Sequence, residues 1–225
     1  MSSESSNVGS CLGCSGYCCT VYTVPVIGYD VWRIVQGQRL APMLFLRYEP
    51  EHTPTDIGFL LQTPGPTYGL ALSHAPARPN THPCVFLVHL RGGVYRCGIY
   101  ADRPLACQTY PMRLNDDHLF VRGDALCPPG SWANLERGQA AWRERLLHRQ
   151  AEWRRYGEVV KAWNTMVSAS NSQEGFRPDE YLAYLVNAYD LISSVPAAEV
   201  AARLASLARG YAQPIAEPRA IDHAG

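Results

Sequence analysis

The sequence predicts an α+β fold, in which a small cysteine-rich N-terminal part with short strands and helices precedes a helical C-terminal part. All eight cysteines lie between Cys11 and Cys127. Short β-branched and aromatic runs, separated by glycine and proline, fill the same region. Beyond residue 133 the apolar residues instead recur at helical spacing. We therefore expect a cysteine-cluster domain over residues 1–132, a helical region over 133–212 and a loose tail over 213–225.

The N-terminal part is expected to combine loops with short helices. Glycines within residues 11–19 favour a tight loop, and the apolar spacing of residues 30–35 predicts a short helix. A second short helix should carry Cys107. The extended or strand candidates are residues 22–26, 57–61, 68–72 and 119–121.

A hairpin is expected between two further strand-like runs, residues 85–90 and 94–100, which flank a glycine turn. This hairpin would bring Cys84, at the start of the first strand, near Cys97.

Three helices are expected in the C-terminal part. The second begins near Pro178 and ends near residue 192, and the third begins near Pro196 and ends near residue 209. The first is long and amphipathic, because its large apolar residues form two adjoining seven-residue series: Leu135, Trp142, Tyr156 and Trp163, then Leu146, Trp153, Val160 and Val167.

Charge and hydropathy exclude several classes of protein. With 20 basic and 20 acidic residues, the chain has no net field to hold a nucleic acid. No apolar run is long enough to cross a membrane. Residues 1–10 lack the basic start and apolar stretch of a secretory signal, so the expected compartment is the cytoplasm. Hydrolase, phosphoryl-transfer and dinucleotide-binding motifs are also missing from the sequence.

The cysteines predict a metal or iron–sulfur centre. A reducing cytoplasm disfavours disulfides, and thiolates are the ligands that zinc and iron–sulfur clusters use. A C-x2-C-x3-C-C cluster opens the series. The eight candidate ligands are Cys11, Cys14, Cys18, Cys19, Cys84, Cys97, Cys107 and Cys127.

The adjacent pair Cys18 and Cys19 argues against equal roles for all eight thiols, since consecutive side chains tend to point apart. Eight thiols could fill two four-coordinate sites, or one site with a remainder. The preferred first set is Cys11, Cys14, Cys18 and Cys107. The remaining four form a second site or a redox reserve: Cys19, Cys84, Cys97 and Cys127.

This pattern resembles the YkgJ-type cysteine cluster family. The most specific block is C-G-I-Y-A-D-R-P-L-A-C, from Cys97 to Cys107. The resemblance implies a zinc- or iron-chelating domain, often labelled an iron–sulfur oxidoreductase, and one branch of similar proteins methylates flagellin lysines. Where the family usually has arginine, this chain has Gln108, so a role in donating to sulfur or holding an anion is weakened or passes to Arg113.

Three residues beside the cysteines are expected to support the site. The Arg103 guanidinium could neutralise a centre made negative by thiolates. Tyr100 and Tyr110 could donate hydrogen bonds to sulfur, although packing is the favoured role for both.

The expected function is an iron–sulfur protein in electron transfer or in cluster-dependent modification of a partner. The alternative is a non-catalytic zinc module that acts in structure or interaction. A protein methyltransferase related to the flagellin branch is a minor alternative. The residues leave open whether the chain is an enzyme, and a protein partner is expected on the C-terminal helices.

Overall fold

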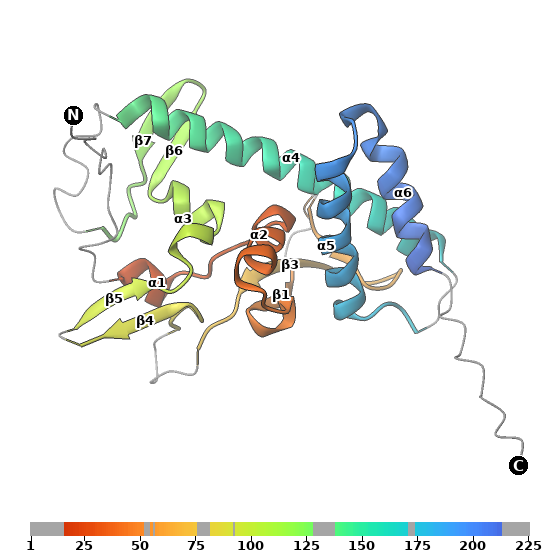
Figure 1. Ribbon diagram of the computed structural model, residues 1–225, viewed down its shortest axis with the longest axis horizontal. Helices are drawn as coiled ribbons and strands as arrows, with labels where there is room; N and C mark the ends of the chain where they lie inside the picture. Colours follow the sequence, from red (N-terminus) through yellow and green to blue (C-terminus); the bar gives the residue numbers. More distant parts are fainter. Residues whose placement is uncertain are drawn as a thin grey trace, which may run out of the picture.

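Short helices and strands alternate in the first half of the chain, and three longer helices form the second half (Figure 1). The computed structural model describes residues 16–51, 55, 57–75, 82–91, 93–127, 138–170 and 174–212. The predictions for Cys11, Cys14, Leu135 and the tail over 213–225 therefore lie outside the described residues. The mixed α+β class with a helical C-terminal part is confirmed.

The α-helices are α1 (Tyr17–Val21), α2 (Gly28–Gln38), α3 (Leu105–Thr109), α4 (Gln139–Ala169), α5 (Pro178–Ser194) and α6 (Val200–Tyr211). Short 3-10 turns are η2 (Pro42–Leu44), η3 (Tyr100–Asp102) and η5 (Ala197–Glu199). The strands are β1 (Leu46–Pro50), β2 (Phe59–Leu60), β3 (Thr67–Leu72), β4 (Leu87–Leu90), β5 (Val94–Cys97), β6 (Met112–Asn115) and β7 (His118–Val121).

The strands form one three-stranded sheet and two hairpins, all antiparallel. The sheet has the order β1-β3-β2, so β3 is central. The predicted hairpin is β4–β5, where Leu87 lies opposite Cys97. The second hairpin, β6–β7, packs near the first turns of α4 (Figure 1). In Figure 1, α3 lies between the two hairpins, which places Cys107 between them.

Several elements differ from the sequence expectation. Residues 22–26 form only an isolated bridge at Pro25, and strand β6 was not expected. Residues 17–21 form helix α1 rather than part of a loop, because Gly16 takes a left-handed conformation (φ 72°) and allows the turn to begin directly after it. Strand β1 was not expected, because its sequence, with Arg47, Glu49 and Pro50, does not show the run of β-branched and aromatic residues typical of a strand. The strand forms because it pairs along its whole length with β3.

One hydrophobic core joins the N-terminal elements to the C-terminal helices. Phe59 of β2 stacks on Tyr181 of α5 with ring centroids 3.8 Å apart. Trp163 of α4 is fully buried, and its indole N–H donates to the carbonyl of Leu60 at 2.7 Å. Asn164 accepts from the Leu60 backbone N–H at 2.8 Å, so α4 holds strand β2 at two neighbouring points. The boundary at residue 132 stays a prediction.

A smaller core fixes the second hairpin to α4. Met112 of β6 packs with Trp142 and Leu146 of α4, and all three are buried. In Figure 1, α4 runs along the molecule from this hairpin to α5 and α6. The predicted long helix and its two successors are thus confirmed, and α4 also reaches the region of the cysteines. No helix in the described ranges combines the length and apolar character needed to cross a bilayer.

Candidate metal centre

Five of the predicted ligands line one cavity of about 340 Å³. They come from α1, from the segment before β4, from the end of β5 and from α3. The five are Cys18, Cys19, Cys84, Cys97 and Cys107. Residues up to 89 positions apart in the sequence are thus brought around one volume. The sequence predicted Cys18 with Cys107 in one set and Cys19 with Cys84 and Cys97 in another, and the cavity holds members of both sets.

Helix α1 and the hairpin are held together by backbone contacts at Gly16 and Cys84. The backbone N–H of Cys84 donates to the carbonyl of Cys19 at 2.7 Å. A Cβ atom on Gly16 would lie 3.1 Å from the Cβ of Tyr95 on β5, and φ at this position is positive. Glycine is therefore required here by both conformation and space. These contacts place the cysteines of α1 next to those of the β4–β5 hairpin.

The short helix α3 is fixed from two sides, which positions Cys107. At its first turn, the buried carboxylate of Asp30 accepts from the backbone N–H of Leu105 at 2.7 Å. At its last turn, Thr109 donates to the carbonyl of Leu105 at 2.7 Å and accepts from Arg149 of α4 at 3.1 Å. Helix α3 has only five residues, so these tertiary contacts rather than helix propensity hold it.

The neighbouring thiols of Cys18 and Cys19 do not point apart, contrary to expectation. Their sulfur atoms are 3.9 Å apart and both line the cavity. Consecutive side chains diverge less on a helix than on a strand, and α1 is helical here. A hydrogen bond from Cys19 lowers the pKa of Cys18 to about 7, while the same bond and burial raise the pKa of Cys19.

The other three cavity thiols favour their protonated form without a cation. Burial raises the pKa of Cys84, of Cys97 and, most strongly, of Cys107. A bound cation reverses this preference, because metal ligation releases the thiol proton. The donor set therefore fits a soft, thiolate-binding metal such as zinc or iron.

The described thiols are nonetheless spread around the cavity. Within the described part of the chain, no three histidine, cysteine or carboxylate side chains are close enough to hold one ion together. Cys11 and Cys14, from the preferred first set, lie outside the described residues. Cys127 is half-buried beside Tyr110 and is not among the described residues that line the cavity.

The predicted supporting residues Arg103, Tyr100 and Tyr110 all line the cavity. The Arg103 guanidinium carbon lies 3.9 Å from the centre of the Tyr100 ring, a cation–π contact. The Tyr110 hydroxyl accepts from the backbone N–H of Leu126 at 2.6 Å, and its ring meets that of Tyr22 at 5.7 Å. Both tyrosines thus have contacts in the cavity wall, which agrees with the favoured packing role.

Besides Arg113, three further arginines line the cavity that the cysteine motifs did not indicate: Arg96, Arg122 and Arg149. Gln108 turns away to donate to the carbonyl of Arg103 at 2.7 Å, whereas Arg113 lines the cavity, as expected if it takes over the role of the missing arginine. Arg149 comes from the long helix, to which the sequence assigned no part of the site. No sequence pattern could have indicated Arg149. Its place in the site is evident only from the folded structure, where it contacts Thr109, 40 residues away in the sequence.

The fold and the cavity define a cysteine-rich protein with thiols and arginines around one hollow. Residues 10–128, more than half of the chain, match the family model CxxCxxCC, described as "Putative zinc- or iron-chelating domain". The chain belongs to this family, which confirms the resemblance found in the sequence. Neither the curated proteins nor the solved structures contain a match to the chain.

Proposed function

We propose that this chain is an iron–sulfur protein whose cluster is held in the cysteine-lined cavity and serves electron transfer or the modification of a partner. The observation that carries the proposal is the convergence of Cys18, Cys19, Cys84, Cys97 and Cys107 on one volume. Cys11 and Cys14, close in sequence to α1, would complete the ligand set. When bound, such a cluster supplies one-electron chemistry.

The spread of the thiols supports a cluster over a single zinc ion. Zinc needs its sulfur ligands at about 2.3 Å from one point. Within the described residues, no three candidate ligands approach that arrangement, although five thiols surround a cavity of about 340 Å³. A multi-atom cluster bridges thiols that lie farther apart than the ligands of one ion.

Arg103 would set the electrostatics of the site. Its charge lies close enough to Cys97 to oppose the rise in the pKa of that thiol caused by burial. A fixed positive charge beside thiolates stabilises their ionised form, and it also favours the reduced state of a centre that gains an electron. The stacking on Tyr100 holds the guanidinium in place for this role.

Exposed apolar side chains on α1 and β4, two of the elements next to the cavity cysteines, support a protein partner. Tyr17 and Val21 of α1 are both 58% exposed, and Val88 and Leu90 of β4 are 43% and 45% exposed. Apolar groups of this size are usually covered when they cluster on a surface. The expected partner contact on the C-terminal helices stays a prediction.

Anaerobic purification followed by a visible spectrum and by iron, sulfide and zinc analysis tests the proposal. We expect a brown protein with broad absorbance, and iron and sulfide in comparable amounts. A colourless protein with stoichiometric zinc and neither iron nor sulfide would contradict the cluster and leave the zinc module.

A further inference from the structure

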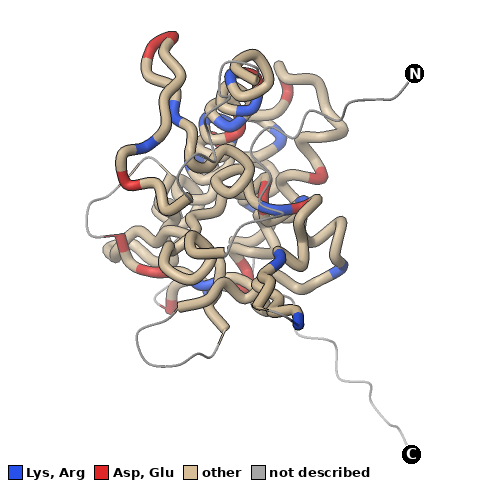
Figure 2. The backbone as a smooth tube through the Cα atoms, turned by 90° about the vertical axis from the view of Figure 1, so that its left-hand side faces the viewer, with Lys and Arg blue, Asp and Glu red and all other residues tan. Residues whose placement is uncertain are grey.

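The cavity is also rich in arginine. Five guanidinium side chains line it, and no aspartate or glutamate of the described residues does so. They are Arg96, Arg103, Arg113, Arg122 and Arg149. The whole chain carries no net charge, and in Figure 2 acidic and basic positions are interspersed over the backbone. The positive lining is therefore a local property of this cavity.

Three of these arginines gather at the β6–β7 end of the cavity from separate elements. Arg113 lies on β6, Arg122 follows β7 and Arg149 lies on α4. Arg122 has a carboxylate partner, Asp124. Arg149 donates to the Thr109 hydroxyl, and the exposed side chain of Arg113 has no hydrogen bond or ion pair with the other described residues. A hydrogen bond from Arg122, together with the charges of Arg122 and Arg113, lowers the pKa of Asp124, so this one carboxylate is the counter-charge of two of the three arginines.

The electrostatics of Arg149 agree with this grouping. Burial lowers its pKa, the charges of Asp30 and Cys107 oppose this change, and the charges of Arg113 and Arg122 add to it. Converging guanidinium groups of this kind cost free energy in the empty protein. An anion between them removes that cost and gains charge-assisted hydrogen bonds.

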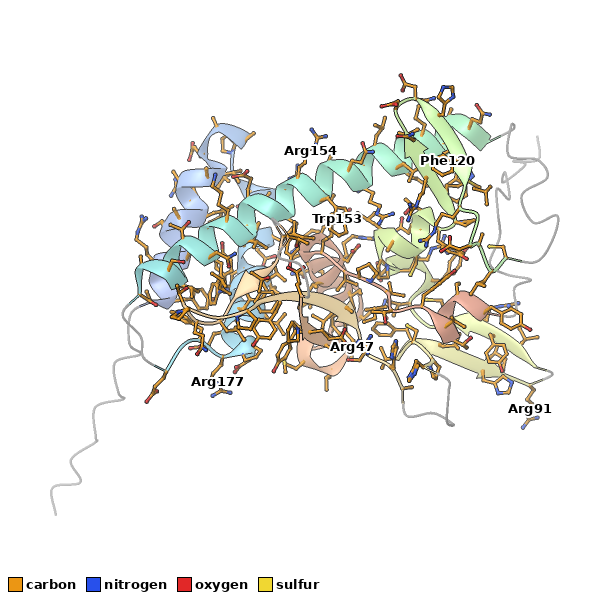
Figure 3. All side chains as sticks on the ribbon, turned by 180° about the vertical axis from the view of Figure 1, so that it is seen from behind. Arg47, Arg91, Phe120, Trp153, Arg154 and Arg177 are labelled. Carbon is orange, nitrogen blue, oxygen red and sulfur yellow. The ribbon has the colours of Figure 1, made fainter. Side chains whose placement is uncertain are left out.

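Arg113 and Arg149 line two hollows. Both line a second, outward hollow of about 530 Å³ between β6 and α4, whose wall includes Trp153. Figure 3 shows Trp153 on the inner side of α4, and Arg154 of the same helix also lines this hollow. The two guanidinium groups are thus shared by the cysteine-lined cavity and by this outward hollow.

We propose that Arg113, Arg122 and Arg149 form a binding site for the oxyanion group, a phosphoryl or a carboxylate, of a small molecule that enters the cysteine-lined cavity. Thiolate charge alone does not account for all the arginines. Four thiolates on a core of charge plus two, whether a divalent ion or a cluster, leave a net charge of roughly minus two, which Arg96 and Arg103 suffice to balance. The oxyanion site does not depend on which metal the cysteines hold.

Isothermal titration of the full chain, with its metal as purified, tests the site with inorganic phosphate and, separately, with acetate. Ionic strength is held constant with chloride, because arginine contacts are screened by salt. We expect saturable binding of at least one anion, and the tighter of the two identifies the group. Arg113→Gln should weaken it by at least about tenfold. This variant should fold, since the Arg113 side chain is exposed.

Arg91→Gln is the matched control. Arg91 lies at the outer end of β4 and points away from the body in Figure 3. It should bind the anion as the unaltered chain does, and the metal content of both variants should be unchanged. Absence of saturable binding for both anions, or equal weakening in the two variants, would overturn the proposal. An unaltered chain that lacks iron and sulfide, yet binds the anion and loses that binding in Arg113→Gln, would instead count against the proposed cluster alone.

Discussion

The buried carboxylate of Asp30 accepts a hydrogen bond from the backbone N–H of Leu105 at 2.7 Å, so that α2 holds the first turn of the helix that carries Cys107. Its other oxygen accepts from the backbone N–H of Ile27 at 3.2 Å and caps α2 itself. One side chain thus joins the hydrophobic core to the wall of the cysteine-lined cavity. Several consequences of this arrangement can be measured.

Asp30 makes stability depend on pH. Burial raises its pKa from 3.8 to about 6, so the folded chain binds this proton more tightly than the unfolded chain. The resulting stability is fully present below about pH 4 and is lost as pH rises through about 6. Relative to Asp30→Asn, the free energy of unfolding of the unaltered chain should fall by about 2–2.5 kcal/mol from pH 4 to pH 7. Urea unfolding at each pH measures this difference. Parallel pH profiles of the two chains would show that Asp30 does not titrate in this way.

Gly28 allows α2 to approach α5 closely. A Cβ atom there would lie 2.3 Å from Cε2 of Tyr189 and 2.7 Å from Cδ1 of Leu185, and both side chains are buried. Gly28→Ala should therefore lower the free energy of unfolding by about 1–3 kcal/mol. Gly157→Ala on α4 is the control, because its Cβ would meet only Ile57 at 4.0 Å and should stabilise the helix by about 0.5–1 kcal/mol. Equal effects of the two substitutions would contradict the close approach.

The hydroxyls of Tyr156 and Tyr181 bond to each other at 3.0 Å inside the core. Either single change to phenylalanine leaves one buried hydroxyl unpaired and should cost about 1–2 kcal/mol. The double variant should cost less than the sum of the two, by at least about 0.5 kcal/mol. A double-mutant cycle in urea measures this coupling. Additive costs of the two substitutions would rule out the hydrogen bond. Tyr48→Phe is the control: because Tyr48 is partly exposed, this change should alter the free energy of unfolding by less than about 0.5 kcal/mol.

Local patterns predicted the elements that bury a periodic apolar face. The helical series that includes Trp142 and Trp163 gave the long helix α4, and the glycine turn before Val94 gave the β4–β5 hairpin. Strand β1 was not predicted from the sequence, because its stability comes from pairing with β3 rather than from its own residues. Helix α1 was predicted as a loop, because the helix depends on the positive φ of a single residue, Gly16, directly before it.

The site was predictable in its chemistry but only partly in its geometry. Residue type and spacing selected the cysteines, and the short helix and the hairpin located Cys107 and Cys97. The closeness of Cys18 to Cys19 depends on α1 being helical. The contribution of Arg149 depends on how α4 lies across α3, which no local pattern contains.

The metal content of anaerobically purified Cys107→Ser, compared with the unaltered chain, tests most directly whether the cavity is the metal centre. Cys107 lines the cavity on a helix held by Asp30 and Thr109, so the hydroxyl should leave the fold intact. Far-UV circular dichroism checks this. We predict stoichiometric iron or zinc in the unaltered chain and a loss of at least about nine-tenths of it in the variant, because serine is a poor substitute for a thiolate ligand. Full metal content in a folded Cys107→Ser chain would contradict the account.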